Sequence, residues 1–483
     1  MTDADFLLWL KSSGALRCVL VEAVARVGVT ETTHYLSSRN YVAADHTVHK
    51  AVITGGCEIS ERLSLTEGAG SMAFSDIELD NSSGALDTWL GYIWRNRAVR
   101  VYYGDVRWDR ADFRLMFDGI IDDLQPRARN VLNIVIRDKL QRLSTPLSET
   151  KLGGSTANKD RLLPLCFGEV HNVEPLLTNP ATLEYQVHAG AIEDIIEARE
   201  QGVPVSITKT VATGKFVLNQ ALRGSTVTCS VQGDKPSTYS NTVAGIVQRL
   251  VTGYGTEPFV SGDLDAANLA AFETAHPQPV GIYFSGTADV LAACQELAAS
   301  VGAQVVMSAT GLLRLIKLGA APGTPLQVTE TTMLEGTLRV ASRVPVKPAV
   351  RLGYCRNYTK QDSLQTGIPA EHKDLFKEEW LTVTSNDATV AGLYKISEEA
   401  VQEDTCLLVA ADAQTEADRR RDLRKVPRTV YACEAYADLM LAELGNAATL
   451  TSSRYSLSGG EDGQIVFVAK DLLRNRVKLE VYI

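Results

Sequence analysis

Alternating apolar and polar residues mark three short segments between positions 98 and 149. A period of two along the chain predicts strands that bury one face and expose the other. Residues suited to tight turns lie between these segments, so the pattern predicts an antiparallel meander of a kind that can close into a small barrel. The predicted strands are residues 99–103, 113–121 and 131–136. The predicted turns contain Gly104-Asp105, Asp122-Asp123 and Gln125-Pro126.

Apolar residues recur at spacings of three and four in many other segments, and this period predicts helices. The helix over residues 288–300 is followed by strands at 304–307 and 312–317, which indicates a compact α+β unit. The other predicted helices are residues 6–10, 85–92, 138–143, 191–200, 242–251, 266–273, 389–399, 411–424 and 430–444, the last ending at Gly445. The other predicted strands are residues 17–27, 58–65, 71–80, 450–457, 464–469 and 476–482.

The clearest linker is residues 151–158, which are small and polar and have no periodicity. A length of 483 residues allows about three domains. We therefore divide the chain into an N-terminal β-barrel domain (1–150), an α+β middle region (151–345) and a C-terminal region with helices and closing strands (346–483). The expected fold class is α+β and rich in β, with antiparallel β-barrels near both ends and α+β subdomains between them.

Composition excludes several classes of protein. Charged residues make up 22% of the chain and apolar residues 45%, as in ordinary folded proteins. The net charge of -10 argues against a surface that coats nucleic acid. The acidic N-terminus lacks the basic region of a signal peptide, and no apolar run approaches the ~20 residues that span a bilayer. We expect a protein that is made in the cytoplasm and stays soluble there or enters an assembly.

The eight cysteines are dispersed, without a C-x-x-C pair or zinc spacing. Cys18, Cys229 and Cys406 lie in apolar or strand-like runs, so we expect reduced core residues. His46 and His49 lie in a predicted loop or strand, where their spacing places the two imidazoles on opposite faces, so we expect no metal site there.

None of the common catalytic motifs is present, neither a nucleophile elbow, a zincin helix, a P-loop nor a dinucleotide fingerprint. Gly253-Tyr254-Gly255 follows a predicted helix instead of opening one, so it predicts a plain loop. We assign no catalytic, cofactor-binding or metal-binding residue and no cofactor, and we expect no enzyme activity.

Three further groups of residues have a structural and a functional interpretation. The acidic predicted helix at 191–200 suggests either a solvated helix or paired carboxylates for glycoside cleavage. A group of three aromatic residues between positions 89 and 94 suggests either a buried core or a platform on which sugars stack. A group of six basic residues between positions 419 and 428 suggests either a solvated helix face paired to Glu416, Asp418 and Asp422, or a contact to DNA or to another subunit. In each case we favour the structural interpretation. These groups are Glu193, Asp194, Glu197 and Glu200; Trp89, Tyr92 and Trp94; and Arg419, Arg420, Arg421, Arg424, Lys425 and Arg428.

Four short segments stand in order along the N-terminal part of the chain: GCEIS at 56–60, DIELDN at 76–81, FDGII at 117–121 and RDKLQRL at 137–143. In their order and spacing they resemble the baseplate hub or tail-tip proteins of long-tailed, siphovirus-like bacteriophages. The segment LPLCFGEV at 163–170 resembles the opening of the next domain in such proteins, and residues 463–483 resemble their closing barrel strands.

The resemblance implies a structural role in the virion, at the tail tip. It implies a homotrimer whose two tail-tube-like barrels per chain form a pseudo-sixfold ring between the hexameric tail tube and a threefold central fibre. The implied partners are further copies of the chain, a tail tube or distal tail protein, the central fibre and the tape-measure protein. DNA would pass transiently through the lumen, and no stable membrane insertion is implied.

Two alternatives stay open. One is a hexameric distal tail protein with an accessory domain. The other is a module that binds or hydrolyses cell-wall glycans, which would need two carboxylates roughly 5 to 10 Å apart in a cleft.

Overall fold

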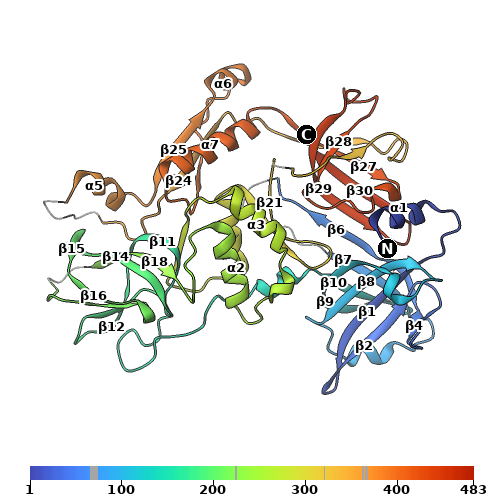
Figure 1. Ribbon diagram of the computed structural model, residues 1–483, viewed down its shortest axis with the longest axis horizontal. Coiled ribbons are helices and arrows are strands. Elements are labelled where there is room, and N and C mark those ends of the chain that lie inside the picture. Colours follow the sequence, from blue (N-terminus) through green and yellow to red (C-terminus); the bar gives the residue numbers. More distant parts are fainter. Residues whose placement is uncertain (66–73, 223–225, 320, 362–363, 365–367) are drawn as a thin grey trace.

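The computed structural model describes residues 1–65, 74–222, 226–319, 321–361, 364 and 368–483. The fold is α+β and rich in β, with several separate sheets (Figure 1). The two ends of the chain lie side by side, and the middle of the chain extends away from them. This confirms the predicted β-rich α+β class. The closure of strands into barrels stays a prediction.

The largest sheet contains strands from both ends of the chain. Its hydrogen-bonded order is β23-β27-β30-β29-β6-β7-β10-β9-β8-β1-β2-β4-β3. We call β1–β5 and β7–β10 the N-terminal β unit: Arg17–Val27, Thr30–Ser37, Tyr41–Val42, Val48–Ala51, Ile53–Gly56, Phe74–Asp80, Ala98–Asp105, Arg114–Ala128 and Val131–Arg137. We call β22, β23 and β27–β30 the C-terminal β unit: Leu326–Val328, Arg339–Val344, Arg428–Ala435, Ala447–Leu450, Glu461–Asp471 and Arg476–Tyr482. Strand β6 (Glu58–Arg62) lies between the two units.

A single apolar cluster runs through both β units. It includes Leu36 and Ile134 from the N-terminal unit together with Val468 and Leu479 from the C-terminal unit. Helix α1 (Asp3–Lys11) adds Phe6, which is fully buried in the same cluster. Burial of apolar surface is the main favourable term in folding, so each β unit depends on the other for its core.

The middle of the chain forms two smaller β layers and a helical layer. Helix α4 packs on β20 of the hairpin that follows it, which confirms the predicted α+β unit, and it also packs on α2. The strands are β11 (Leu165–Val173), β12 (Leu176–Asn179), β13 (Glu184–Gln186), β14 (Ile192–Glu200), β15 (Val203–Val205), β16 (Ile207–Thr210), β17 (Lys215–Leu218), β18 (Val227–Asp234), β19 (Gly281–Phe284), β20 (Ala303–Met307) and β21 (Leu313–Lys317). The helices are α2 (Val243–Gly253), α3 (Ala266–Ala275) and α4 (Val290–Ala299).

A further layer precedes the last strands. Helix α7 packs on β24 and β25 of a three-stranded sheet. Its elements are β24 (Ala349–Tyr354), α5 (Ala370–Lys377), β25 (Leu381–Asn386), α6 (Ala388–Tyr394), β26 (Gln402–Asp404) and α7 (Ala410–Arg424). Short 3-10 helices lie at Asp87–Gly91, Arg110–Asp112, Lys139–Leu143, Val211–Thr213, Ser261–Asp263 and Ala437–Leu439.

The predicted meander is confirmed, because β8, β9 and β10 pair antiparallel in sequence order. Its predicted turns are wrong: Gly104 and Asp105 end β8, and residues 122–126 continue β9. Pro126 is tolerated because β8 pairs with β9 only as far as Ile120, so the missing N–H of Pro126 lies on the side that β8 leaves unpaired.

Five of the ten predicted helices are confirmed, three are confirmed in part and two are wrong. Residues 6–10, 242–251, 266–273, 288–300 and 411–424 are helical, whereas 85–92 and 138–143 contain only 3-10 turns and the helix predicted at 389–399 ends at Tyr394. The predicted helix at 191–200 is strand β14, and the one at 430–444 is strand β27 followed by a 3-10 turn. Of the predicted strands, 450–457 is mostly loop and 71–73 lies outside the described residues.

Candidate functional site

The outer edge of β23 has no strand partner in the described part of the chain. This strand ends the large sheet and pairs only with β27. Most of its side chains are exposed, including Arg339, Val340 and Arg343. An exposed edge of this kind presents unpaired N–H and C=O groups to another chain.

The opposite end of the same sheet also has an open edge. Strand β2 pairs with β1 along its length but with β4 only at Leu36 and Ser37. Beyond it, the cross-strand pair Val42 and Val48 is exposed by 58% and 61%. We call these two ends, β23 on one side and β2–β4 on the other, the sheet edges. They are the surfaces best suited to association among the described residues.

Helix α1 docks on the chain itself. Phe6 and Leu10 are buried, whereas Leu8 is 68% exposed. The Nδ2 atom of Asn475 donates to the carbonyl of Leu10 at 3.2 Å. The N-terminal helix therefore covers the boundary between the two β units, as a cap would.

The acidic group at 191–200 lies on strand β14 and not on a helix. Glu193 pairs with Lys235, and Asp194 with Lys209 at 2.8 Å. The exposed carboxylates thus have cationic partners, which favours the structural interpretation.

The aromatic group is a buried cluster around His34. The ring centroids of Trp89 and Trp94 are 5.2 Å apart, and each ring is 4% exposed. His34 lies 4.6 Å from Trp89 and stacks on Tyr92 at 5.8 Å. Burial of both tryptophans leaves no platform on which a sugar could stack.

His46 and His49 do not meet at a site. His46 has a left-handed backbone (φ 68°) in a turn, and His49 is 2% exposed between Tyr35 and Tyr41. Burial lowers the pKa of His49, so its ring is held neutral.

The basic group on α7 differs from a solvated face. Arg420 is 2% exposed and donates to Glu416 at 2.8 Å and to Glu403 at 2.7 Å. Arg419 also bonds Glu416, at 2.6 Å. Burial alone would raise the pKa of Glu416, but Arg419 and Arg420 outweigh it and lower the pKa to about 2. The solvated interpretation is wrong for Arg420, whereas Arg421 does pair with Asp418 and Asp422 near the surface.

Sequence reasoning missed a buried polar cluster in the middle region. The Nε2 atom of His188 lies 3.2 Å from Asp234 Oδ1, and the N–H of Cys166 donates to Nδ1 at 3.0 Å. Arg249 and the Tyr254 hydroxyl also donate to Asp234, at 2.6 and 3.0 Å. The five residues are spread over positions 166 to 254, so no local motif marks them.

This cluster resembles a Cys-His-Asp constellation only in its residue types. The Cys166 thiol is fully buried, and burial raises its pKa well above the ordinary value. The Nδ1 atom of His188 is occupied by the backbone N–H of Cys166, so it cannot serve as a base for the thiol. The cluster is a buried structural network.

Other candidate chemistry is sparse. All eight cysteines are free thiols, of which Cys355 alone is partly exposed. Gly253 ends α2 and Gly255 lies in the loop beyond it, as predicted. The described residues contain no group of three or more His, Cys, Asp or Glu that could hold a metal ion. None of the helices among them is long and apolar enough to cross a membrane.

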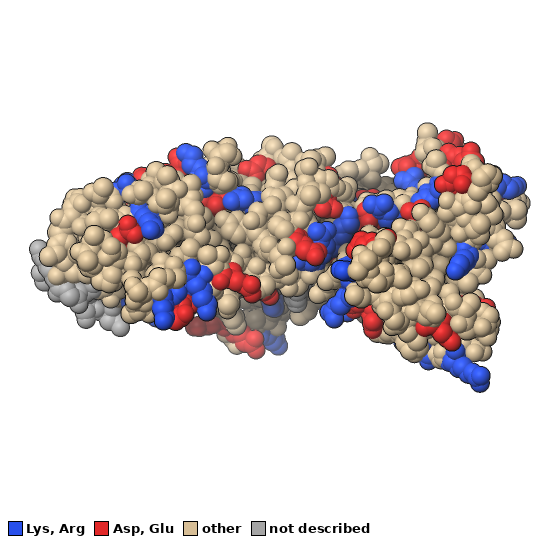
Figure 2. Space-filling model, turned by 90° about the horizontal axis from the view of Figure 1, so that it is seen from below, with Lys and Arg blue, Asp and Glu red and all other residues tan. Residues whose placement is uncertain are grey.

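Charges of both signs are interspersed over the face shown in Figure 2, with broad uncharged areas between them. This face therefore offers no large patch of one sign for nucleic acid.

Solved structures of three tail proteins are similar to this chain over nearly its full length. They are the tail protein from Neisseria meningitidis MC58 (10% identity, 97% of this chain and 96% of that chain, TM-score 0.42), the prophage MuSo2 43 kDa tail protein from Shewanella oneidensis (9%, 96% and 98%, 0.42) and the prophage tail protein gp18 from Listeria monocytogenes EGD-e (8%, 96% and 94%, 0.39). No protein-family model matches the chain, and no curated protein matches it.

Proposed function

We propose that the chain is a structural subunit of a bacteriophage tail, a baseplate hub or tail-tip ring that joins the tail tube to the central fibre and lines the DNA exit channel. The observation that carries the proposal is the pair of open sheet edges at opposite ends of one sheet. If the β23 edge of one copy pairs with the β2–β4 edge of the next, the contact is head-to-tail. Repeating such a contact gives a closed ring when the rotation between neighbouring copies divides a full turn evenly.

The resemblance of the sequence segments supports three copies. Each copy then contributes two β units, and these form six barrel-like segments around a lumen. The partners are a tail tube or distal tail protein above, a central fibre below, and the tape-measure protein and DNA in passage. The protein acts at the virion tail tip after synthesis in the cytoplasm, without enzyme activity or membrane insertion.

The test is the mass of the purified protein by light scattering, with negative-stain images of the particle end-on. A trimeric ring about as wide as a tail tube supports the hub. A hexamer favours the distal tail protein, and a monomer at all concentrations contradicts both and favours the glycan module.

A substitution at a sheet edge sharpens this test. Val340→Lys places a charge on the outermost strand, where lysine discourages strand pairing, so we expect smaller particles with unchanged folding. Val260→Lys is the matched control, because Val260 is 66% exposed in a loop away from both edges. Equal particle masses for Val340→Lys and the unsubstituted chain would exclude the β23 edge as the contact.

A further inference from the structure

Strand β6 lies between the two β units. It pairs with β29 over five residues, from Arg62 with Phe467 to Glu58 with Asp471. Among the described residues it also pairs with β7 of the N-terminal unit, through Ser60 and Phe74. The chain enters β6 from β5 of the N-terminal unit, so β6 follows one unit in sequence and pairs with the other.

The chain bends sharply just before β6. Gly56 and Cys57 both have left-handed backbones, with φ of 73° and 57°. A Cβ atom on Gly56 would lie 2.1 Å from the carbonyl oxygen of Asp76, so only glycine fits there. A few residues at the end of an element can act as a hinge by absorbing a change in backbone angles.

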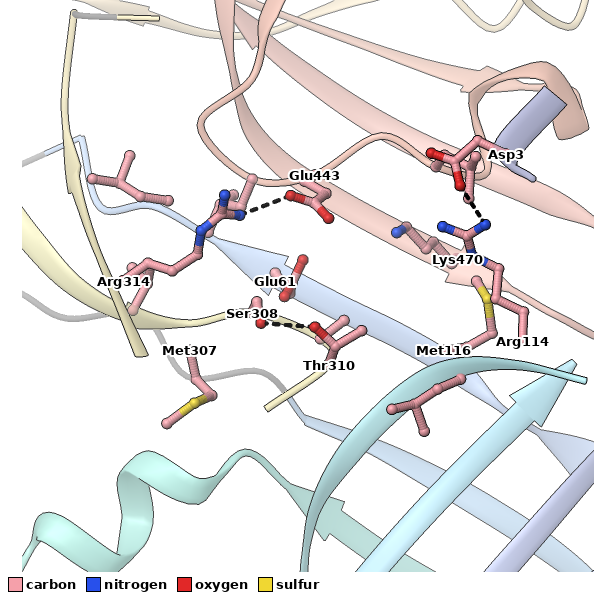
Figure 3. A pocket seen from close by; sticks show the side chains of 16 residues that line it. Asp3, Glu61, Arg114, Met116, Met307, Ser308, Thr310, Arg314, Glu443 and Lys470 are labelled. Carbon is pink, nitrogen blue, oxygen red and sulfur yellow. Dashed lines mark hydrogen bonds and ion pairs between the residues drawn. The ribbon is translucent and has the colours of Figure 1, made fainter. Parts of the chain in front are cut away.

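A cavity of about 120 Å³ lies against the inner face of β6 (Figure 3). Glu61 of β6 and Lys470 of β29 both line it, and they are only 5% and 6% exposed. The Oε1 atom of Glu61 has no hydrogen-bond partner, and among the described contacts no ion pair joins Glu61 to Lys470. Burying charged groups without full pairing costs free energy, so these two side chains disfavour the arrangement in which β6 pairs with β29.

The charged groups that face Glu61 come from four elements and from the loop that contains Glu443. Four of the charged side chains that line the cavity are paired with one another. Arg314 of β21 donates to Glu443 at 2.7 Å, and Arg114 of β9 donates to Asp3 of α1 at 2.6 Å (Figure 3). Lys470 of β29 completes the set. Glu61 is left in the centre with incomplete compensation.

The outer face of the same ladder is well satisfied. Arg62 forms two bonds to Glu480, at 2.7 and 2.9 Å, and Lys478 bonds Glu58 at 3.0 Å. The imperfect pairing is therefore confined to the inner face of β6.

We propose that β6 is a releasable latch: it parts from β29 by turning at Gly56 and Cys57, and the incompletely paired Glu61 and Lys470 side chains gain water when it opens. The proposal concerns the single chain and holds whether or not the chain assembles in a tail. Opening breaks the β6–β29 ladder, which is the one strand connection between the two β units among the described residues.

The latch depends on pH. Burial, assisted by Glu443, raises the pKa of Glu61 to about 7, although Lys470 and Arg314 act against it. Between pH 4.5 and about 7, the Glu61 carboxyl therefore keeps its proton when β6 is paired with β29 and loses it when β6 opens. The protonated carboxyl favours the paired state fully below pH 4.5, and this contribution is lost as pH rises through about 7. Burial lowers the pKa of Lys470, whose deprotonation at higher pH acts in the opposite sense. We therefore expect more opening at pH 8 than at pH 6.

Hydrogen exchange on the full chain tests the latch at these two pH values. The exchange rates of the amides of β6 and β29 are compared with those of the β27–β30 ladder at the same pH. The comparison cancels the intrinsic effect of pH on the rate of amide exchange. At pH 8 we expect opening at β6–β29 to be about tenfold more frequent than at β27–β30. Glu61→Leu combined with Lys470→Met removes both buried charges and reduces this excess about tenfold. Labelling of the Cys57 thiol, 1% exposed beside β6, should change in parallel.

The matched control is Arg62→Gln with Glu480→Gln, which removes an ion pair from the outer face of the same ladder. Arg62 is half exposed, so we expect less than about a twofold change. Equal exchange in both ladders, unaltered by the buried double substitution, contradicts the latch.

A crosslink provides an independent test should the buried substitutions unfold the chain. Ser60 and Ala469 are direct partners across the ladder, so Ser60→Cys with Ala469→Cys places two thiols for a disulfide. Oxidation should slow the labelling of Cys57 about tenfold and reduction should restore it. Identical labelling in both states overturns the proposal.

Discussion

At the scale of single residues, the most consequential charge is the buried carboxylate of Glu416. Its side chain is 7% exposed and bonds two guanidinium groups. The pKa falls from 4.5 to about 2, so the carboxylate stabilises the folded state above pH 4.5, and this stability is lost as pH falls toward 2. We expect Glu416→Gln to lower the free energy of unfolding at pH 7 by about 3 kcal/mol. Urea unfolding at pH 7, 4 and 2.5 measures this, and the difference should shrink as pH falls.

The control for Glu416→Gln lies on the same helix. Asp422 pairs with Arg421 and Lys425, but its side chain is 52% exposed. Solvent screens such pairs, so Asp422→Asn should change the free energy of unfolding by less than about 0.5 kcal/mol. A loss for Glu416→Gln no larger than that for Asp422→Asn would show that burial of the Glu416 network does not stabilise the fold.

The sequence predicted the burial of a residue well where burial follows from the side chain itself, and poorly where it depends on a partner from a distant segment. Apolar Cys18, Cys229 and Cys406 are buried as predicted, because a free thiol behaves as a small apolar group. Arg420 was expected at a solvated face and is buried instead. Its partner Glu403 precedes α7 in another element, and no spacing in the helix reveals that contact.

At the scale of elements, the docking of α1 depends on one carboxylate. The Asp105 side chain is fully buried and accepts from Trp9 Nε1 at 3.0 Å and from the Leu16 N–H at 2.9 Å. Hydrogen bonds from Arg107 and Trp9 hold its pKa well below the ordinary range despite burial. Asp105→Asn replaces one acceptor by a donor, so we expect α1 to detach at a cost of about 2 kcal/mol. Tryptophan emission should shift to the red as Trp9 leaves Trp108.

Asp3→Asn is the control for detachment of α1. Asp3 lies on the same helix and pairs with Arg114, but its side chain is 73% exposed. We expect little change in stability or emission. Should Asp105→Asn leave the emission unchanged, the other contacts of α1, among them the packing of Phe6 and Leu10, hold the helix without Asp105.

Helices with a continuous apolar stripe were predicted correctly, and the two errors have identifiable causes. In β14, a register shift between Ile195 and Glu197 places Ile195 and Ala198 on the same face at an interval of three, and Ile192 is buried as well. A bulge thus gives a strand the spacing of a helix. In β27, pairing with β23 and β30 on both sides overrides the helical preference of its alanines.

At the scale of the whole molecule, the pairing of the chain ends lay beyond sequence reasoning. The sequence predicts strands at 58–65 and 464–469, but nothing in either segment specifies the other as its partner. The same holds for the sheet edges of the candidate site, which are defined by the strand order and not by composition. Register between distant strands follows from a shared core, and that core is assembled only in three dimensions.

This interdependence predicts how fragments behave. Residues 1–150 expressed alone lack β29 and the C-terminal half of the shared apolar cluster. We expect this fragment to be unfolded or molten, with poorly dispersed NMR signals and fast hydrogen exchange in β7–β10. Mixing residues 1–345 with 346–483 should restore slow exchange in those strands, because the cut at 345 falls in the loop between β23 and β24 and leaves β6–β29 pairing free to form.

The cut chain supplies its own control. The middle region has a separate apolar cluster that includes Phe167, Val247 and Leu297, so its exchange should be little affected by loss of residues 346–483. Cys406, Leu407 and Ala413 are its few members from beyond the cut. If residues 1–150 alone instead show the slow exchange of the full chain, the N-terminal β unit is an independent domain. The β6–β29 ladder would then be a contact between two finished domains, and the shared core would contribute little to either.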